Sequence, residues 1–474
     1  MADKFGNAYL TYEAFVKDEI RRKEFLDSQA HKNYVYYKGD HLGILYYLEQ
    51  HLGRIITDKT VLNKMPKVYV NDVRRVVKRL CLAYSEAPER EYSSLSEEQQ
   101  AILEMVYPEY KEFHRQAKLL NTIVVRPIWS DKHKRFRFMV LGRHYATAIT
   151  NQNDQFDLEE LYYPRMVQKG DKQEIVYFHW TDEDVWLTDE DGNEINPMSV
   201  NIELPEDGNP YGRIPFVTLR LETCEDFWGD GLSDYVNLVE INNGRLCDAT
   251  YKQWLSFGYP IGTNLGIKAH DFEISPYNPV MVDNVRTDMV TPDLRFVTPD
   301  HAIEEDKSLI DWTRKAGGTS KGMSAATFQD EEKDLSGYAK QIDNLELMEN
   351  NAEDIEALRG FEYDLLEMMK LELNVRGGPS MDSVNLTSIK FNEYGFPKTT
   401  DEINAEREFE YRYNLSTPVD WMKQNRPDLS DEEIKELLKE NRALKVELGD
   451  GRPTLLEKLR SGDNLGNAQR DVLR

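Results

Sequence analysis

The stretch GLSDYVNLVEINNGRLCDATYKQWLSF, residues 231–257, decides the fold. Its apolar side chains recur at helical spacing, so we predict one long helix over this range. The residues on the apolar stripe are Leu232, Val236, Val239, Leu246 and Trp254. The middle of the helix, Asn242-Asn243-Gly244, is unusually polar and small for a helix that packs in a core.

The segment that follows this helix differs in composition. Residues 258–300 hold 5 of the chain's 19 prolines, with short strand candidates at 280–282 and 295–297. A proline-punctuated segment between two helices indicates a small projecting β subdomain. Residues 301–315 are predicted to be helical again, and Gly317-Gly318-Thr319-Ser320 is expected to end that helix.

A still longer helix is predicted after a polar stretch. Residues 335–374 keep helical periodicity throughout, and at ~1.5 Å per residue they would span roughly 60 Å. Helical patterns of this length are typical of repeats, coiled coils or large assemblies. A strand candidate follows at 388–392. The tail from Asp401 is helical and charged, with a helix start at Pro418 and a capping box at 430–433.

The first third of the chain mixes helices with short strands. Residues 40–56 and 73–84 are predicted helices, and a capping box at 96–99 opens another, which is expected to run to about Pro108. The exposed side of the second helix is basic. It is either a nucleic-acid-binding face or an ordinary solvated face. Its basic residues are Arg74, Arg75, Lys78 and Arg79.

From about residue 121 to residue 221 the pattern changes to strands. Four runs rich in β-branched and aromatic residues are strand candidates, at 122–128, 135–141, 174–180 and 185–188. The sequence Asp-Glu-Asp-Gly-Asn at 189–193 predicts a polar turn. A calcium loop is not expected there, because an EF-hand glycine at Gly192 would put Leu187 where the first aspartate belongs.

Charge and composition exclude several classes of protein. The 474 residues include 59 Lys+Arg and 85 Asp+Glu, a net charge of −26, and the length predicts more than one domain. This acidity argues against a general nucleic-acid binder, because such affinity comes from lysine and arginine. A protein that touches DNA without adhering to it, and an acidic enzyme, both stay open.

Three cysteines, Cys81, Cys224 and Cys247, lie far apart and form no disulfide or zinc pattern. The N-terminus lacks a signal-peptide pattern, and no apolar run approaches the ~20 residues of a membrane helix. We therefore expect a soluble intracellular protein without membrane contact.

Motifs that carry chemistry are absent from the sequence. We find no H-E-x-x-H, no G-x-S-x-G and no G-x-G-x-x-G after a strand. Residues 317–322 fit the first six positions of a phosphate-binding loop, but Met323 replaces the lysine that would reach the phosphates. No catalytic residue, cofactor or metal site is predicted, and we expect no enzymatic activity.

The order of these elements resembles that of the portal proteins of tailed double-stranded-DNA bacteriophages. Four stretches resemble family motifs in the same order along the chain. They are YYKGDH at 36–41, NPYGRIPFV at 209–217, WGDGLSD at 228–234 and DLSGYA at 334–339.

The resemblance implies a mostly helical α+β portal fold that forms dodecameric rings around a DNA tunnel. It divides the chain into the family's wing, stem, clip and crown regions. The divisions are wing at 1–230, stem helices at 231–257 and 301–316, clip at 258–300, a tunnel loop, long tunnel helix and return to the wing at 317–400, and a helical crown with the C-terminal tail at 401–474.

The same resemblance implies a role at the unique capsid vertex of the virion, after assembly in the bacterial host cytoplasm. The ring would pass double-stranded DNA without sequence preference during packaging and ejection. It would bind the large terminase subunit, which supplies the ATPase, the head–tail adaptor proteins, and the major capsid and scaffolding proteins. Twelve copies carry a charge of about −312, which would repel phosphates and keep DNA moving. The polar middle of the first stem helix would then border the tunnel or a neighbouring subunit.

Two sets of site residues follow from this resemblance. The tunnel-loop candidates are Lys321, Phe328, Asp330, Glu331, Glu332, Lys333 and Asp334. The partner-binding candidates in the clip are Tyr277, Val280, Met281, Val282, Arg286, Arg295 and Phe296. Lys321 and Lys333 either give the loop limited contact with backbone phosphates or are ordinary loop lysines.

Two other classes of protein stay open at this point. One is a different phage structural ring or adaptor, although an adaptor would usually be much shorter. The other is an acidic intracellular enzyme without a recognisable motif, which would place titrating residues together in a concave cluster.

Overall fold

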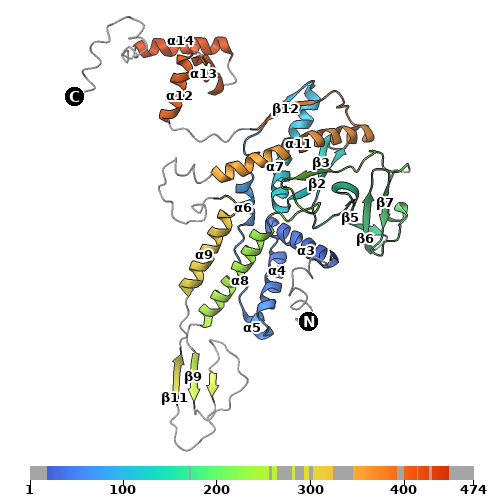
Figure 1. The fold of residues 1–474 in the computed structure, drawn as a ribbon, viewed down its shortest axis with the longest axis vertical. Helices are drawn as coiled ribbons and strands as arrows, with labels where there is room; N and C mark the ends of the chain where they lie inside the picture. The colour runs from blue at the N-terminus through green and yellow to red at the C-terminus, as the bar shows by residue number, and fades with distance from the viewer. Residues whose placement is uncertain are drawn as a thin grey trace, which may run out of the picture. The chain divides into compact units, whose positions relative to one another are not determined.

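The computed structural model describes most of the chain in two compact units, Met1–Tyr394 and Gly395–Arg474 (Figure 1). About 51% of the described residues are helical and 19% lie in strands, so the described structure is mixed α+β. The described residues are 19–169, 172–205, 207–255, 259–263, 280–282, 293–297, 303–323, 345–391, 400–413, 415–425 and 430–447.

The described part of the first unit begins with four helices. They are α3 (Glu19–Lys38), α4 (His41–Ile55), α5 (Lys59–Lys64) and α6 (Val73–Leu80). The prediction of α4 is confirmed, and Asp40 caps it by accepting a hydrogen bond from the Leu42 amide at 3.2 Å. The predicted helix at 73–84 is shorter than expected, because α6 ends at Leu80, and α3 had not been predicted.

Helix α7 (Glu97–Leu120) begins as predicted but runs further. Ser96 and Gln99 form the capping box. The expected end near Pro108 is wrong, because the helix continues for twelve more residues with Pro108 inside it. Pro108 lies on the exposed side, where water can satisfy the carbonyl that loses its partner.

Two antiparallel sheets follow α7 in the first unit. One has the order β3-β2-β8, and the other is the meander β4-β5-β6-β7. The predicted strands are all present, whereas β4, β5 and β8 had not been predicted. The bounds are β2 Thr122–Ser130, β3 Arg135–Leu141, β4 Thr147–Asn151, β5 Asp154–Lys169, β6 Lys172–Trp180, β7 Val185–Thr188 and β8 Val217–Arg220.

The segment after β7 is the predicted polar turn. The Asp189 carboxylate accepts hydrogen bonds from the amides of Asp191, at 3.0 Å, and Asn193, at 2.8 Å. Gly192 has a φ of +82°, which suits glycine.

Helix α11 (Leu345–Arg376) lies against the first sheet and completes the core. Leu358, Phe361, Leu365 and Met369 are buried, as the predicted periodicity requires. The Phe361 ring lies 5.9 Å from that of Phe113 on α7. The helix runs two residues past the predicted end at 374, and residues 335–344 lie outside the described residues.

A two-stranded sheet joins distant parts of the first unit. Strand β1 (Glu89–Tyr92) pairs antiparallel with β12 (Leu386–Lys390), which overlaps the strand predicted at 388–392. The chain therefore returns to its N-terminal third after α11.

Two helices and a small sheet follow these two sheets in the chain. They are α8 (Ser233–Leu255), β9 (Tyr259–Thr263), β10 (Val280–Val282), β11 (Asp293–Val297) and α9 (Ile303–Thr319). The sheet has β9 at its centre, with β10 parallel to it and β11 antiparallel. The predicted strands at 280–282 and 295–297 are confirmed, and β9 had not been predicted.

The second unit contains α12 (Thr400–Arg412), α13 (Pro418–Asn425) and α14 (Asp431–Glu447). Helix α13 begins at Pro418 as predicted. The predicted capping box is also present, because the Ser430 amide donates to Glu433 Oε2 at 2.9 Å and the Glu433 amide donates to Ser430 Oγ at 3.4 Å. Across the described ranges of both units, we find no helix with the length and apolar character needed to cross a membrane.

The partly buried side chain of His144 makes the fold sensitive to acid. His144 stacks on Tyr34 of α3 with ring centroids 4.4 Å apart. Burial, with His31 and Lys38 nearby, lowers the pKa of His144 to about 4. The unfolded chain binds this proton near pH 6.5, so stability is fully present above that pH and falls as the pH drops toward 4.

We therefore expect His144 to account for about 1–2 kcal/mol of the stability lost between pH 7 and pH 5. Urea unfolding of the wild type and of His144→Gln at both pH values measures this difference. Equal losses in the two proteins would contradict the assignment.

Candidate functional site

Helices α8 and α9 form an antiparallel pair, shown side by side in Figure 1. Three side-chain contacts join them. Their residue numbers rise along α9 and the turn after it and fall along α8, as an antiparallel pair requires. In order, they join Lys252 Nζ to Asp306 Oδ2 at 3.5 Å, Thr313 Oγ1 to Asn242 Oδ1 at 2.8 Å, and Lys321 Nζ to Asp234 Oδ2 at 2.8 Å.

A glycine lets the two helices pack tightly against each other. A Cβ atom on Gly317 would lie 2.2 Å from Leu238 Cδ2 on α8. The helix runs four residues past its predicted end at 315, but it does end within the stretch 317–320 that was expected to stop it. Gly317 lies inside α9, where the absence of a side chain lets Leu238 pack, and the helix ends at Thr319.

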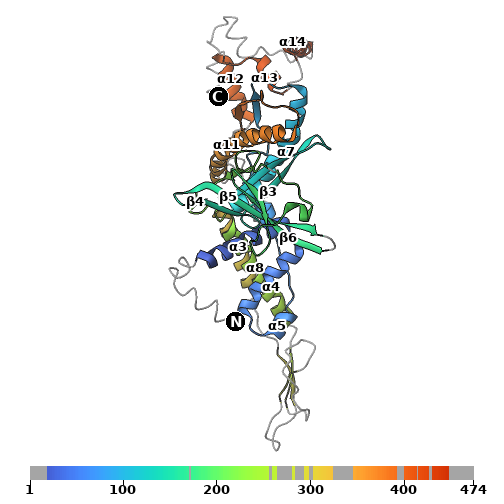
Figure 2. The same ribbon diagram turned by 90° about the vertical axis from the view of Figure 1, so that its right-hand side faces the viewer.

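The polar middle of α8 is explained by contacts within the chain. Asn242 accepts the bond from Thr313 on α9, and Asn243 Oδ1 accepts from the Val70 amide at 2.9 Å. Both asparagines are buried, so the expectation that they border a tunnel or a neighbouring subunit is wrong. Gly244 lets α4 lie against α8, because its Cβ would be 3.0 Å from the His51 ring (Figure 1, Figure 2).

A buried carboxylate ties this helix pair to α6. Asp72, which is 7% exposed, immediately precedes α6. It accepts hydrogen bonds from Tyr235 Oη of α8 at 3.1 Å and from Arg314 NH2 of α9 at 2.9 Å. The start of α6 is thereby fixed to both helices.

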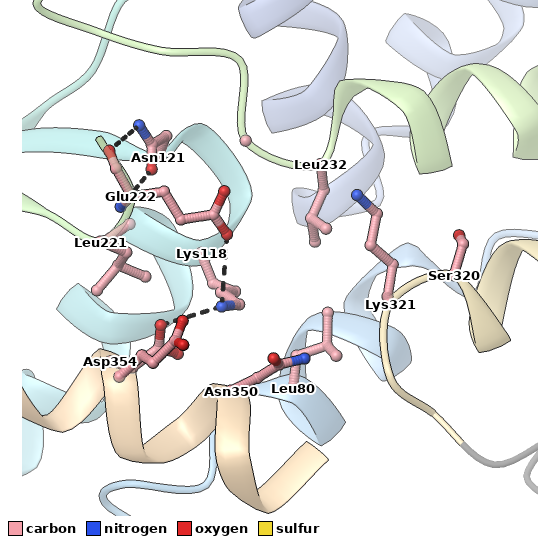
Figure 3. A pocket seen from close by; sticks show the side chains of 13 residues that line it. Leu80, Lys118, Asn121, Leu221, Glu222, Leu232, Ser320, Lys321, Asn350 and Asp354 are labelled. Atoms are coloured by element: carbon pink, nitrogen blue, oxygen red, sulfur yellow. Dashed lines mark hydrogen bonds and ion pairs between the residues drawn. The ribbon is translucent and has the colours of Figure 1, made fainter. Parts of the chain in front are cut away.

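A cavity of about 180 Å³ lies where α7 ends, α8 begins and α9 meets α11 (Figure 3). Lys118 lies within it, with Nζ 3.0 Å from Asp354 Oδ1 and 3.9 Å from Glu222 Oε1. Lys321 also lines it and forms its ion pair with Asp234. The lining residues labelled in Figure 3 are Leu80, Lys118, Asn121, Leu221, Glu222, Leu232, Ser320, Lys321, Asn350 and Asp354.

The ionisable groups of this cavity join α11 to α7. Asp354 uses its second oxygen to bind His114 Nε2 at 2.9 Å, so both oxygens have partners. Its two neighbours make Asp354 an anchor for α11. Within the described ranges, no group of histidine, cysteine, aspartate and glutamate side chains could hold a metal ion.

The backbone at Gly231 brings α8 close to α7. Gly231 has a φ of +55°, and the next amide, of Leu232, donates to the Leu119 carbonyl at 3.0 Å. A Cβ on Gly231 would lie 2.2 Å from that carbonyl oxygen. Glycine is therefore required at this position on two separate grounds.

We expect Gly231→Ala to destabilise the first unit by about 3 kcal/mol or more, because it combines left-handed strain with overlap on rigid backbone. Gly192→Ala is the matched control. Gly192 also has a positive φ, but nothing lies within 4 Å of its Cβ position, so we expect a cost of about 1 kcal/mol. Urea unfolding measures both variants, and equal costs would contradict the argument.

The structure describes one of the tunnel-loop candidates. Lys321 lies in the turn after α9, paired with Asp234 on α8. The other candidates lie outside the described residues. They are Phe328, Asp330, Glu331, Glu332, Lys333 and Asp334.

The clip candidates fall on two strands of one sheet. Val280, Met281 and Val282 form β10, and Arg295 and Phe296 belong to β11. These strands flank β9 on opposite sides. Tyr277 and Arg286 lie outside the described residues.

The charged residues that join these helices to one another were not predicted from the sequence. Asp72, Lys118 and Asp354 lie far apart in the sequence, and each resembles an ordinary surface charge.

No protein-family model matches this chain, and no curated protein matches it either.

Proposed function

We propose that this chain is the portal protein of a tailed double-stranded-DNA bacteriophage. Twelve copies would form a ring at the unique capsid vertex, and the ring would conduct DNA during packaging and ejection. The chain would have no catalytic activity of its own.

One observation carries this proposal. Helices α8 and α9 form an antiparallel pair, and the chain between them contains the three-stranded sheet β9–β11. This arrangement supports a stem of two helices with a clip between them. The turn at Lys321 and the long α11 then follow in the order expected of a tunnel loop and a tunnel helix.

The separate C-terminal unit also supports the proposal. It begins at Gly395, close to the expected crown boundary at residue 401, and its described residues are largely helical. In this proposal the two sheets and the helices before α8 are the wing.

The proposal assigns partners to these regions. The clip sheet would bind the large terminase subunit during packaging and the head–tail adaptors afterwards. The capsid and scaffolding proteins would surround the ring, so the protein would be located in the virion after assembly in the host cytoplasm.

The mass of the purified full-length chain tests this function. Light scattering is expected to give about 660 kDa, twelve times the 55.3 kDa of one chain. Negative-stain images of the same fraction should show rings with a central hole. A chain that stays at the mass of a monomer or dimer across a range of salt and protein concentrations would contradict the proposal.

A further inference from the structure

Helix α6 presents a wholly basic outer face in an acidic protein. Its inner residues, Val73, Val76, Val77 and Leu80, are at most 3% exposed. All four outer residues are exposed and basic in a chain whose net charge is −26. They are Arg74, Arg75, Lys78 and Arg79, which we call the basic face of α6.

Three of these four positive charges have no counter-charge in the part of the chain that the structure describes. Arg74, Lys78 and Arg79 form no ion pair with any residue in that part. Arg75, in contrast, has partners, and Asp72 at 3.9 Å is one of them. Like charges four residues apart on a helix also cost a few tenths of a kcal/mol per pair. An external anion would remove that cost.

Both ends of α6 are fixed to the helices that flank residues 324–344. At its start, Asp72 binds Arg314 of α9. At its end, Asn351 Nδ2 of α11 donates to the Leu80 carbonyl at 3.1 Å. Leu80 also lines the cavity that contains Lys321 and Asn350 (Figure 3). Helix α6 therefore lies beside the two points where the candidate tunnel loop leaves and rejoins the described structure.

We propose that the basic face of α6 binds the phosphate backbone of double-stranded DNA beside the tunnel loop. This inference rests on the proposed portal function. The eight residues of α6 span about 12 Å, and a duplex carries one phosphate charge per ~1.7 Å of its axis. A face of one sign without interspersed acids suits such a uniform polyanion. Arg74 and Arg79 can also bind phosphate through paired N–H groups.

The test compares two variants with the same change in charge. Arg74→Gln/Lys78→Gln/Arg79→Gln removes three charges from α6. Lys132→Gln/Lys134→Gln/Arg137→Gln removes three exposed charges around the β2–β3 hairpin. For each protein, light scattering gives the ring mass, and fluorescence anisotropy gives the affinity of the ring for a labelled linear duplex between about 50 and 200 mM salt.

We expect all three proteins to form the same ring. The α6 variant should bind the duplex at least about tenfold more weakly, with a salt slope reduced by about 0.9 for each phosphate that it no longer neutralises. The hairpin variant should differ less than about twofold from the wild type.

Three results would overturn the inference. If wild-type rings form and both variants bind DNA equally, the α6 inference fails and the portal proposal stands. If only the α6 variant fails to form rings, although it unfolds at the wild-type urea concentration, the basic face binds a second copy of the chain. If the wild type forms no ring, the portal proposal fails and this inference fails with it.

Discussion

Replacing Glu362 with glutamine is expected to lower the free energy of unfolding of the first unit by about 3–5 kcal/mol. The Glu362 carboxylate on α11 binds Arg90 of β1 through Nε at 2.6 Å and NH2 at 2.8 Å. The side chains are 1% and 4% exposed. Tyr84 Oη also donates to Glu362 at 2.8 Å. The substitution would leave a buried guanidinium without a counter-charge, which costs far more than the pair contributes.

Glu356→Gln is the control for this prediction. Glu356 is also on α11, but its side chain is 81% exposed and lies 3.9 Å from Arg359, so we expect a change within about 0.5 kcal/mol. Urea unfolding followed by circular dichroism compares the two variants. The double variant Arg90→Met/Glu362→Leu should recover much of the lost stability, because it removes both charges. A loss below about 1 kcal/mol for Glu362→Gln would contradict this account.

Asp354→Asn is expected to cost about 3 kcal/mol, the second large effect. Asp354 is 2% exposed and binds both Lys118 and His114. Lys118 would keep only Glu222, which is 3.9 Å away and 74% exposed, so its charge would be poorly compensated.

The control for this second prediction is Asp364→Asn on the exposed side of α11. It carries the same chemical change, and we expect less than about 0.5 kcal/mol. The measurement is again the urea dependence of unfolding. If Asp354→Asn is no more harmful than its control, the carboxylate does not anchor α11 to α7.

Local signals in the sequence predicted many elements correctly. Capping boxes located the starts of α7 and α14, and proline located the start of α13, because caps and first-turn prolines act within one turn of the chain. The helical spacing of apolar residues predicted α8 and α11. The short strands β3 and β7 have the bounds predicted for them, since each is a compact run of β-branched or aromatic residues.

Tertiary contacts account for the elements that were mispredicted. Strand β5 was missed because its first half, from Asp154 to Glu160, is rich in acids and lacks a clear alternation. Pairing with a strand on each side nevertheless stabilises it. Helix α9 runs past its predicted end at 315 and includes Gly317, which has no side chain and so admits Leu238 of α8. Neither the pairing of β5 nor the packing of Leu238 on Gly317 can be predicted from a short stretch of the sequence.

The candidate site was predicted in part. Strand propensity located β10 and the core of β11. Their pairing with β9, however, joins residues 19 apart in the sequence for β10 and 30 to 38 apart for β11. The polar Asn242-Asn243 was assigned to an outer surface because a single helix does not show what packs on it. Thr313 and Val70 donate to the Oδ1 atoms of these side chains from elsewhere in the chain.

The side chain of Asn351 binds two backbone amides whose hydrogen exchange reports on the contact between α11 and α6. Its Oδ1 accepts from the amides of Leu82, at 3.0 Å, and Ala83, at 3.2 Å, just beyond the end of α6. These two amides can exchange with deuterium only when Asn351 withdraws. Their exchange rates would therefore show, at the resolution of single residues, how often the long helix detaches from the helix that carries the basic face.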